Sequence, residues 1–242
     1  MCQRLLTAKS SSIEDENLVI GKLKMAQSAN FTASVEALLF DVIASDELDA
    51  EFQSASQHQY KNLSVQILGC GWKLPSRTNV SIPPEMQLLI DAYSSFYLNK
   101  RPQILLTWRF KLGELTLKYS YKELKFDLVM LPIQAIILLL FNNNKKRKLN
   151  YIEIAELSGI SEHDILKRIL HSLSCPNKVI KIPILSKDPS TVSSSRSSSK
   201  TIDESDVFSI NESFNSRLRR VSIYMYILVE EGIVINITCN MM

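Results

Sequence analysis

The chain has 242 residues, of which 45% are hydrophobic and 22% charged, and its formal net charge is +3. This composition is that of a globular protein, excludes a largely disordered or membrane-embedded chain, and gives no sign of a polyanionic partner. The four cysteines lie far apart without a neighbouring histidine cluster, so we predict reduced thiols and no zinc site. These cysteines are Cys2, Cys70, Cys175 and Cys239.

Residues 12–57 have the pattern of amphipathic helices. Glu14 and Asp15 suit a helix N-terminus, and a second helix is predicted after Phe31. The apolar stripe of that second helix consists of Val35, Leu38, Leu39, Val42 and Ile43. Ser45 is a candidate N-cap for a further helix. Helices this amphipathic need a partner surface, so the segment predicts the end of a helical bundle.

The next segment changes from helical spacing to alternation, which is typical of strands. Leu63, Val65 and Ile67 alternate with polar residues, and a helix is predicted to begin at the pair Pro83 and Pro84. Three further alternating runs predict an antiparallel meander. They are Leu106, Trp108 and Phe110, then Leu115, Leu117 and Tyr119, then Phe126, Leu128 and Met130. One helix beside a small antiparallel sheet predicts an α+β subdomain.

From Pro132 the spacing is helical again, and three short helices are predicted. Gly159 suits a left-handed C-cap for the second helix. Ser161 with Asp164 predicts a capping box for the third helix. The turn with glycine between the last two helices is typical of a helix-turn-helix unit.

Alternation then predicts two strands that form a wing beside these helices. The strands are Val179–Ile184 and Val207–Ile210, and the Ser-rich stretch Ser190–Lys200 is predicted to be the tip of the wing. A last strand containing Val221, Ile223 and Met225 is predicted to return to the first sheet. Helix-turn-helix plus wing predicts a winged helix, so the fold class is α+β throughout.

No group of residues in the sequence matches a known catalytic pattern. His58, His163 and His171 are isolated from one another and are expected on the surface. The sequence contains no G-x-S-x-G elbow, no Walker loop and no H-E-x-x-H motif. We therefore predict a chain with no enzymatic activity, no cofactor and no metal ion.

The basic run Lys145–Lys148 opens the helix-turn-helix unit, so a winged-helix nucleic-acid-binding protein is the alternative function. The third helix of that unit carries Glu162 and Asp164 beside Lys167 and Arg168. Such mixed charge would meet the phosphate backbone with both attraction and repulsion. We favour a solvated basic loop and expect no nucleic-acid partner.

A colinear series of sequence blocks from Arg4 to about Met225 resembles the cullin family. The blocks are RLLTAKSSSIEDENLVIGKLK, LSVQILGCGW, IPPEMQ, FYLNK, LTW, IILLLFNN, EIAELSGI, ILKRILHSLSCPNKV and DVFSINESFNSRLRRVSI. The chain departs from the family where Arg101, Pro102, Gln103 and Ile104 replace the usual His-Ser-Gly-Arg turn. The Ser-rich insert also enlarges the wing.

The resemblance implies a C-terminal cullin homology region truncated at both ends. Its implied divisions are the end of the helical bundle at 1–57, the α/β subdomain at 58–131, the first winged helix with the Ser-rich insert at 132–212, a return strand at 213–227 and an unrelated tail at 228–242. Cullins carry a modifiable lysine in a second winged helix. Nothing after Met225 resembles that domain, and Ile227–Met242 contains no lysine, so we expect no modified lysine here.

The resemblance also implies function: a non-catalytic, cytoplasmic and nuclear scaffold of a cullin-RING ubiquitin ligase, acting in ubiquitin-dependent protein degradation. In cullins the α/β subdomain holds an N-terminal strand of a RING-box protein, which recruits a ubiquitin-conjugating enzyme. Strand addition suits an open sheet edge, because such an edge carries unpaired backbone groups. The predicted contacts with the RING-box strand are Val65, Ile67, Leu115, Leu117, Phe126, Leu128, Val221 and Ile223.

Overall fold

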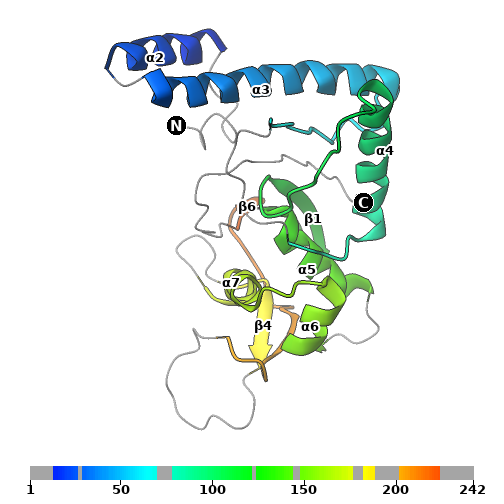
Figure 1. Cartoon of the computed structure of the whole chain (residues 1–242). Helices are drawn as coiled ribbons and strands as arrows, with labels where there is room; N and C mark the ends of the chain where they lie inside the picture. Colours follow the sequence, from blue (N-terminus) through cyan, green and yellow to red (C-terminus); the bar gives the residue numbers. More distant parts are fainter. Residues whose placement is uncertain are drawn as a thin grey trace.

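A computed structural model of the chain describes residues 13–26, 29–69, 78–121, 124–143, 148–176, 182–188 and 202–223. A helical arm lies at one end of the molecule, a first sheet in the middle and a second sheet at the other end (Figure 1). Helices combined with two small sheets confirm the α+β class. None of the described helices has the length and apolarity that crossing a bilayer requires.

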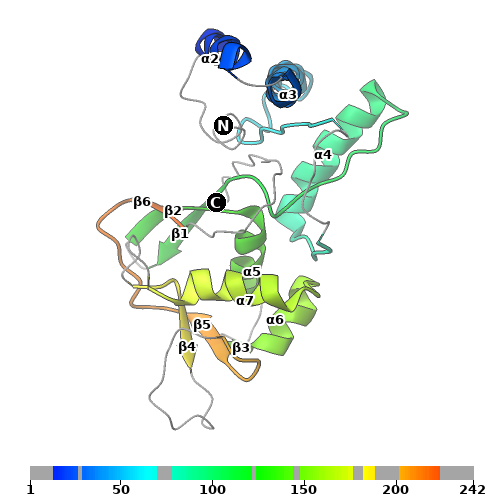
Figure 2. The same ribbon diagram turned by 60° about the vertical axis from the view of Figure 1, so that its left-hand side comes forward.

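The helical arm consists of α2 (Ile13–Ala26) and α3 (Ala29–Ala55), which lie side by side (Figures 1 and 2). Their shared core contains Ile20, Val35, Leu38 and Leu39. The predicted helix start at Ser45 is wrong, because α3 continues through this position. The buried Ser45 hydroxyl donates to the carbonyl oxygen of Asp41 at 2.7 Å, one turn back in the same helix, so it does not cap a new one.

The first sheet has the strand order β1-β2-β6. β1 (Leu115–Tyr121) and β2 (Leu124–Met130) are antiparallel, and β6 (Arg220–Ser222) pairs with β2 in parallel. The amide of Ile223 extends this pairing by donating to the carbonyl of Val129 at 2.7 Å. The two predicted hairpin strands and the returning strand are thus confirmed. The run 106–110, predicted as a third meander strand, lies outside the sheet.

An aromatic cluster joins α3 to α4 (Pro84–Lys100) and to the chain that precedes β1. α4 begins at the predicted proline pair and buries Met86, Ile90, Tyr93 and Tyr97. The ring of Phe52 on α3 lies 4.9 Å from that of Tyr93, and Tyr93 lies 6.2 Å from Trp108. The indole N–H of Trp108 donates to Ser94 Oγ at 3.1 Å. These contacts fix α4 roughly across the end of α3, as Figure 1 shows.

The second unit follows the order α5 (Pro132–Asn143), β3 (Lys148–Asn150), α6 (Tyr151–Ser158), α7 (His163–Ser174), β4 (Leu185–Asp188) and β5 (Val207–Ile210). Its strands are antiparallel in the order β3-β5-β4. The three predicted helices and β5 are confirmed. Of the other predicted wing strand, 179–181 lie outside the described residues and 182–184 belong to no strand, while β4 begins at Leu185. The predicted tip of the wing lies outside the described residues.

Helix caps in this unit differ from the prediction in one place. Asn150 caps α6 in a capping box with Glu153, and Gly159 ends the helix in the left-handed conformation, as predicted. The predicted capping box of Ser161 for α7 is wrong, since Glu162 occupies the N-cap and makes no side-chain cap. We call the part of the chain before α5 the first unit. The carboxylate of Glu162 instead binds Thr78 and Lys111 of this unit.

Gly159→Ala is expected to lower the free energy of unfolding by about 1–2 kcal/mol, because φ is positive there. A Cβ at this position would also lie 3.0 Å from Ser81 Oγ and 3.2 Å from Ser81 N. Urea unfolding followed by circular dichroism measures the loss. The control is Gly21→Ala in α2, where an added Cβ meets nothing within 4 Å and is expected to stabilise by up to about 1 kcal/mol. Equal stability of the Gly159 variant and the wild type would contradict the expectation.

Candidate strand-docking interface

Residues 64–69 run as an extended chain along α3 but belong to neither sheet (Figure 1). Side chains of α3 accept hydrogen bonds from alternate amides of this segment. Val65 N donates to Asp49 Oδ2 at 3.0 Å, Ile67 N to Ser45 Oγ at 2.8 Å, and Gly69 N to Asp41 Oδ2 at 3.0 Å. The predicted strand is therefore extended as expected, but a helix takes the place of a neighbouring strand on one edge.

The opposite edge of the extended segment is not paired within the described residues. The backbone amides of Gln66 and Leu68 have no acceptor among them. The Gln66 side chain is only 4% exposed, yet neither its Nε2 nor its Oε1 makes a hydrogen bond. A buried polar group without a hydrogen bond costs about 1–3 kcal/mol. A protein that supplied hydrogen bonds to the Gln66 side chain would therefore gain affinity.

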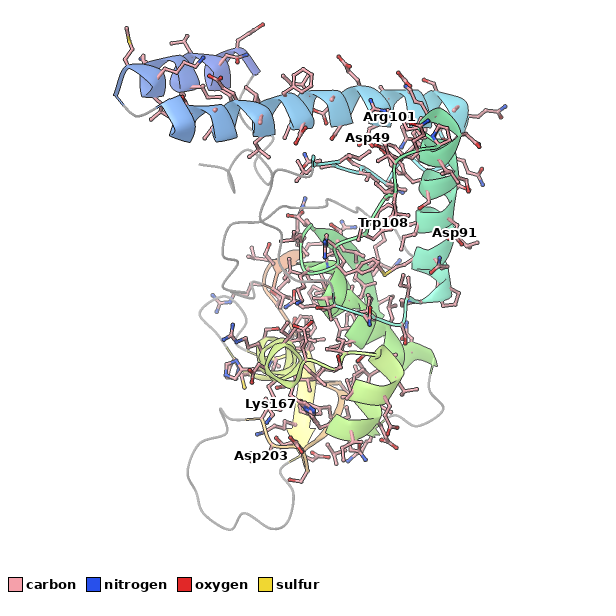
Figure 3. The ribbon with its side chains drawn as sticks, viewed as in Figure 1. Asp49, Asp91, Arg101, Trp108, Lys167 and Asp203 are labelled. Carbon is pink, nitrogen blue, oxygen red and sulfur yellow. The ribbon has the colours of Figure 1, made fainter. Side chains whose placement is uncertain are left out.

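A second extended segment, residues 104–109, runs from α4 to β1 outside the sheets (Figure 1). Leu106 and Trp108 pack against the core, whereas Leu105, which precedes Leu106, is 90% exposed. Figure 3 shows Trp108 on this segment and Asp49 on α3 above it. The alternation predicted for this run is present, but no strand pairs with it among the described residues.

The first sheet has one long edge strand. β2 is central and pairs on both sides, so β1 and β6 form the edges of the sheet. β1 has seven residues and β6 three, so β1 carries the longer row of backbone groups at an edge. Unpaired edge groups of this kind are what an added strand binds.

The eight predicted contact residues lie in two places. Val65 and Ile67 belong to the extended segment, and the other six belong to the first sheet or to its extension at Ile223. All except Ile67 are buried in the core of the chain itself. The buried side chains stabilise the core of the chain itself. The groups available to a partner are therefore the backbone N–H and C=O groups at the strand edges. Their contact with a RING-box strand stays a prediction.

Sequence reasoning missed the three residues of α3 that bind the extended segment. Asp41, Ser45 and Asp49 are spaced four apart and thus lie on one face of the helix. Each has a short side chain with an acceptor oxygen. The signal in the sequence was a row of short acceptor side chains on one helix face, close to a segment with alternating apolar residues. This combination could have indicated that the helix binds the backbone of that segment.

Two tyrosines have a pKa that is raised by their surroundings. Burial, with a smaller contribution from the Asp49 charge, raises the pKa of Tyr93, and burial also raises the pKa of Tyr151. His58, His163 and His171 are exposed, as predicted. The Nδ1 of His163 lies 3.1 Å from the hydroxyl of Tyr151. Among the described residues, no group of three or more histidines, cysteines or acids could hold a metal ion.

Three lysines of the second unit, among them Lys187, form ion pairs with acids. Lys148 Nζ lies 2.7 Å from Asp188, and Lys167 Nζ lies 3.8 Å from Glu204. Figure 3 shows Lys167 on α7 close to Asp203, on the segment that precedes β5. The rest of the basic run, 145–147, lies outside the described residues. This mixed charge gives no support to the alternative of nucleic-acid binding.

A polar junction joins the two units. Lys111 is buried, and its Nζ lies 3.0 Å from Glu162 Oε2, while the hydroxyl of Thr78 donates to Glu162 Oε1 at 2.6 Å. Close by, Ser81 N donates to the carbonyl of Ser158 at 2.7 Å. The turn between α6 and α7 is thereby fixed to two loops of the first unit. We call Thr78, Lys111 and Glu162 the junction triad.

The molecule is thus an α+β domain with extended backbone edges, and comparison with known proteins identifies its family. A family model described as the cullin alpha+beta domain matches residues 69–214. The chain is 31% identical over 229 residues to Cullin-1 of Oryza sativa subsp. japonica, covering 92% of this chain and 29% of that protein. It is also 31% identical over 228 residues to Cullin-4A of Mus musculus, covering 92% of this chain and 28% of the relative.

A third relative is Cullin-3 of Dictyostelium discoideum, 31% identical over 253 residues that cover 92% of this chain and 32% of the relative. The chain belongs to the cullin family, which confirms the resemblance carried by its sequence blocks. It spans less than a third of the length of these curated relatives.

Proposed function

We propose that this chain is a non-catalytic scaffold region of a cullin-RING ubiquitin ligase and that it binds a RING-box protein in ubiquitin-dependent protein degradation. The observation that carries the proposal is the extended segment 64–69, which is bonded to α3 along one edge and joins no sheet. Family membership supports the same role. Through the RING-box protein the chain would also reach a ubiquitin-conjugating enzyme.

The proposed binding mode is addition of a RING-box strand between the extended segment and the first sheet. Backbone pairing supplies affinity in this mode, and alternate side chains supply specificity. Gln66 and Leu68 lie on the edge that has no described acceptor, and Leu105 is the most exposed apolar residue of the second extended segment. Burial of these groups by a partner strand would remove apolar surface from water and satisfy the Gln66 amide.

The second unit supports the scaffold in a different way. We propose that residues 132–210 form a winged helix, which is supported by the element order α5-β3-α6-α7-β4-β5 and the sheet order β3-β5-β4. Its apolar helices pack in one core with the first sheet, including Leu166 and Ile169 of α7. The second unit would then stabilise the first sheet, next to which the RING-box strand is proposed to bind. A crystal structure of the RING-box complex that lacks this arrangement would contradict the assignment.

The direct test is coexpression of the chain with a RING-box protein, followed by size-exclusion chromatography. We expect the two proteins to coelute as a stable 1:1 complex, because strand addition buries backbone and apolar groups together. The control is the same RING-box protein without its N-terminal strand, which is expected not to coelute. A folded, soluble preparation of the chain that fails to bind the intact RING-box protein would contradict the proposed function.

A further inference from the structure

The contact between α3 and the extended segment depends on a match between two repeats. On a helix, residues four apart are separated by about 6.0 Å along the axis. In an extended chain, residues two apart are separated by about 6.6–6.8 Å. Asp41, Ser45 and Asp49 can therefore meet three successive odd-numbered amides, and they do so in reverse order along the segment.

Asp49 and Ser45 each make more than one contact with the extended segment. Asp49 accepts from Val65 N with both carboxylate oxygens, and its Oδ2 also accepts from the Ser64 hydroxyl at 2.5 Å. The Ser45 oxygen accepts from Ile67 N and lies 3.1 Å from the Ile67 carbonyl oxygen. A hydrogen bond to a charged acceptor is stronger than a neutral one, so Asp41 and Asp49 hold the two ends of the segment firmly.

The pairing also decides which backbone groups face a partner. Successive residues of an extended chain point their amides to opposite edges. Since the amides of Val65, Ile67 and Gly69 all point to α3, those of Gln66 and Leu68 point away from it. The helix thus aligns the segment and presents its even-numbered amides as one edge.

We propose that Asp41, Ser45 and Asp49 are positioning residues that preorder segment 64–69 for strand addition, without touching the partner. This inference rests on the proposed function. A segment already held in its bound conformation loses less conformational entropy when a strand joins it. Removal of one of these acceptors would let the segment leave the extended conformation, so partner affinity would fall although every contacting residue is unchanged.

The test uses the full chain, amide hydrogen exchange by NMR, and titration with a RING-box protein. Ser45→Ala is expected to speed exchange at Ile67 by about tenfold or more while the β1 and β2 amides stay protected. Ser45→Ala and Asp49→Ala are each expected to weaken the Kd for the RING-box protein by about tenfold. In the wild type, binding should slow exchange at Gln66 and Leu68.

The matched control is Ser54→Ala, because Ser54 also donates to the carbonyl four residues back, that of Ala50 at 2.9 Å, and is exposed on the same helix. Its Kd is expected to equal that of the wild type. If Ser45→Ala and Asp49→Ala keep β1–β2 protection and bind as tightly as the wild type, the positioning role is overturned while the proposed function stands. If the folded wild-type chain does not bind the RING-box protein at all, both are overturned.

Discussion

Leu128→Ala is expected to lower the free energy of unfolding by about 3–5 kcal/mol, the largest effect that we predict for a single substitution in this chain. Leu128 is 0% exposed on the central strand of the first sheet, where it pairs with Leu117 of β1 and Val221 of β6. Removal of three carbons there leaves a cavity that three strands would have to close. Urea unfolding monitored by circular dichroism measures the loss.

Leu105→Ala is the matched control for this experiment. The chemical change is the same, but Leu105 is 90% exposed, so its substitution is expected to change stability by no more than about 0.5 kcal/mol. A loss below about 1 kcal/mol for Leu128→Ala would mean that β2 is not the centre of the core. Binding experiments on Leu128 variants must therefore be preceded by a stability measurement.

Glu162→Ala is expected to cost about 2–3 kcal/mol of unfolding free energy, because it leaves the Lys111 ammonium without its carboxylate. The side chain of Lys111 is 6% exposed and that of Glu162 is 35% exposed. Water that reaches the Glu162 side reduces the cost below that of a fully buried pair. The double variant Lys111→Met with Glu162→Ala is expected to be more stable than Glu162→Ala alone, since no charge then remains buried.

The exposed ion pair between Arg220 and Glu114 is the control for the junction triad. Its atoms lie 3.2 Å apart, but both side chains are largely exposed, so Glu114→Ala is expected to cost less than about 1 kcal/mol. Equal losses for Glu114→Ala and Glu162→Ala would contradict the view that burial gives the junction triad its strength. The comparison uses the same urea titrations.

Periodic apolar spacing predicted much of the fold. β1, β2 and the buried face of α7 have clean repeats, so their existence and type follow from the sequence. Ser45 was misplaced because a serine hydroxyl can cap a helix that follows it or bond to the turn before it, and spacing alone does not separate the two. Ser161 was misplaced for a related reason: Glu162 is bound by Lys111, more than fifty residues earlier in the chain.

The candidate interface was only partly predictable. Alternation in 63–67 correctly indicated an extended segment, because it reports which side chains are buried. It carries no information on what accepts the backbone amides, and here α3 accepts them in place of a strand. The eight residues predicted as partner contacts were chosen by alternation, so seven of them are core residues.

The parallel pairing of β2 with β6 has a consequence for biosynthesis. Asp127 pairs with Arg220, and 220 − 127 gives a separation of 93 residues, within which the whole second unit is made. At about 5–20 residues per second, a ribosome needs roughly 5–20 s to make this stretch. During that interval the nascent β2 lacks its β6 neighbour. Nascent chains of this protein are therefore expected to need a chaperone that shields the exposed edge of β2 in this interval. Pairing of strands so distant in sequence also makes the final step of folding slow.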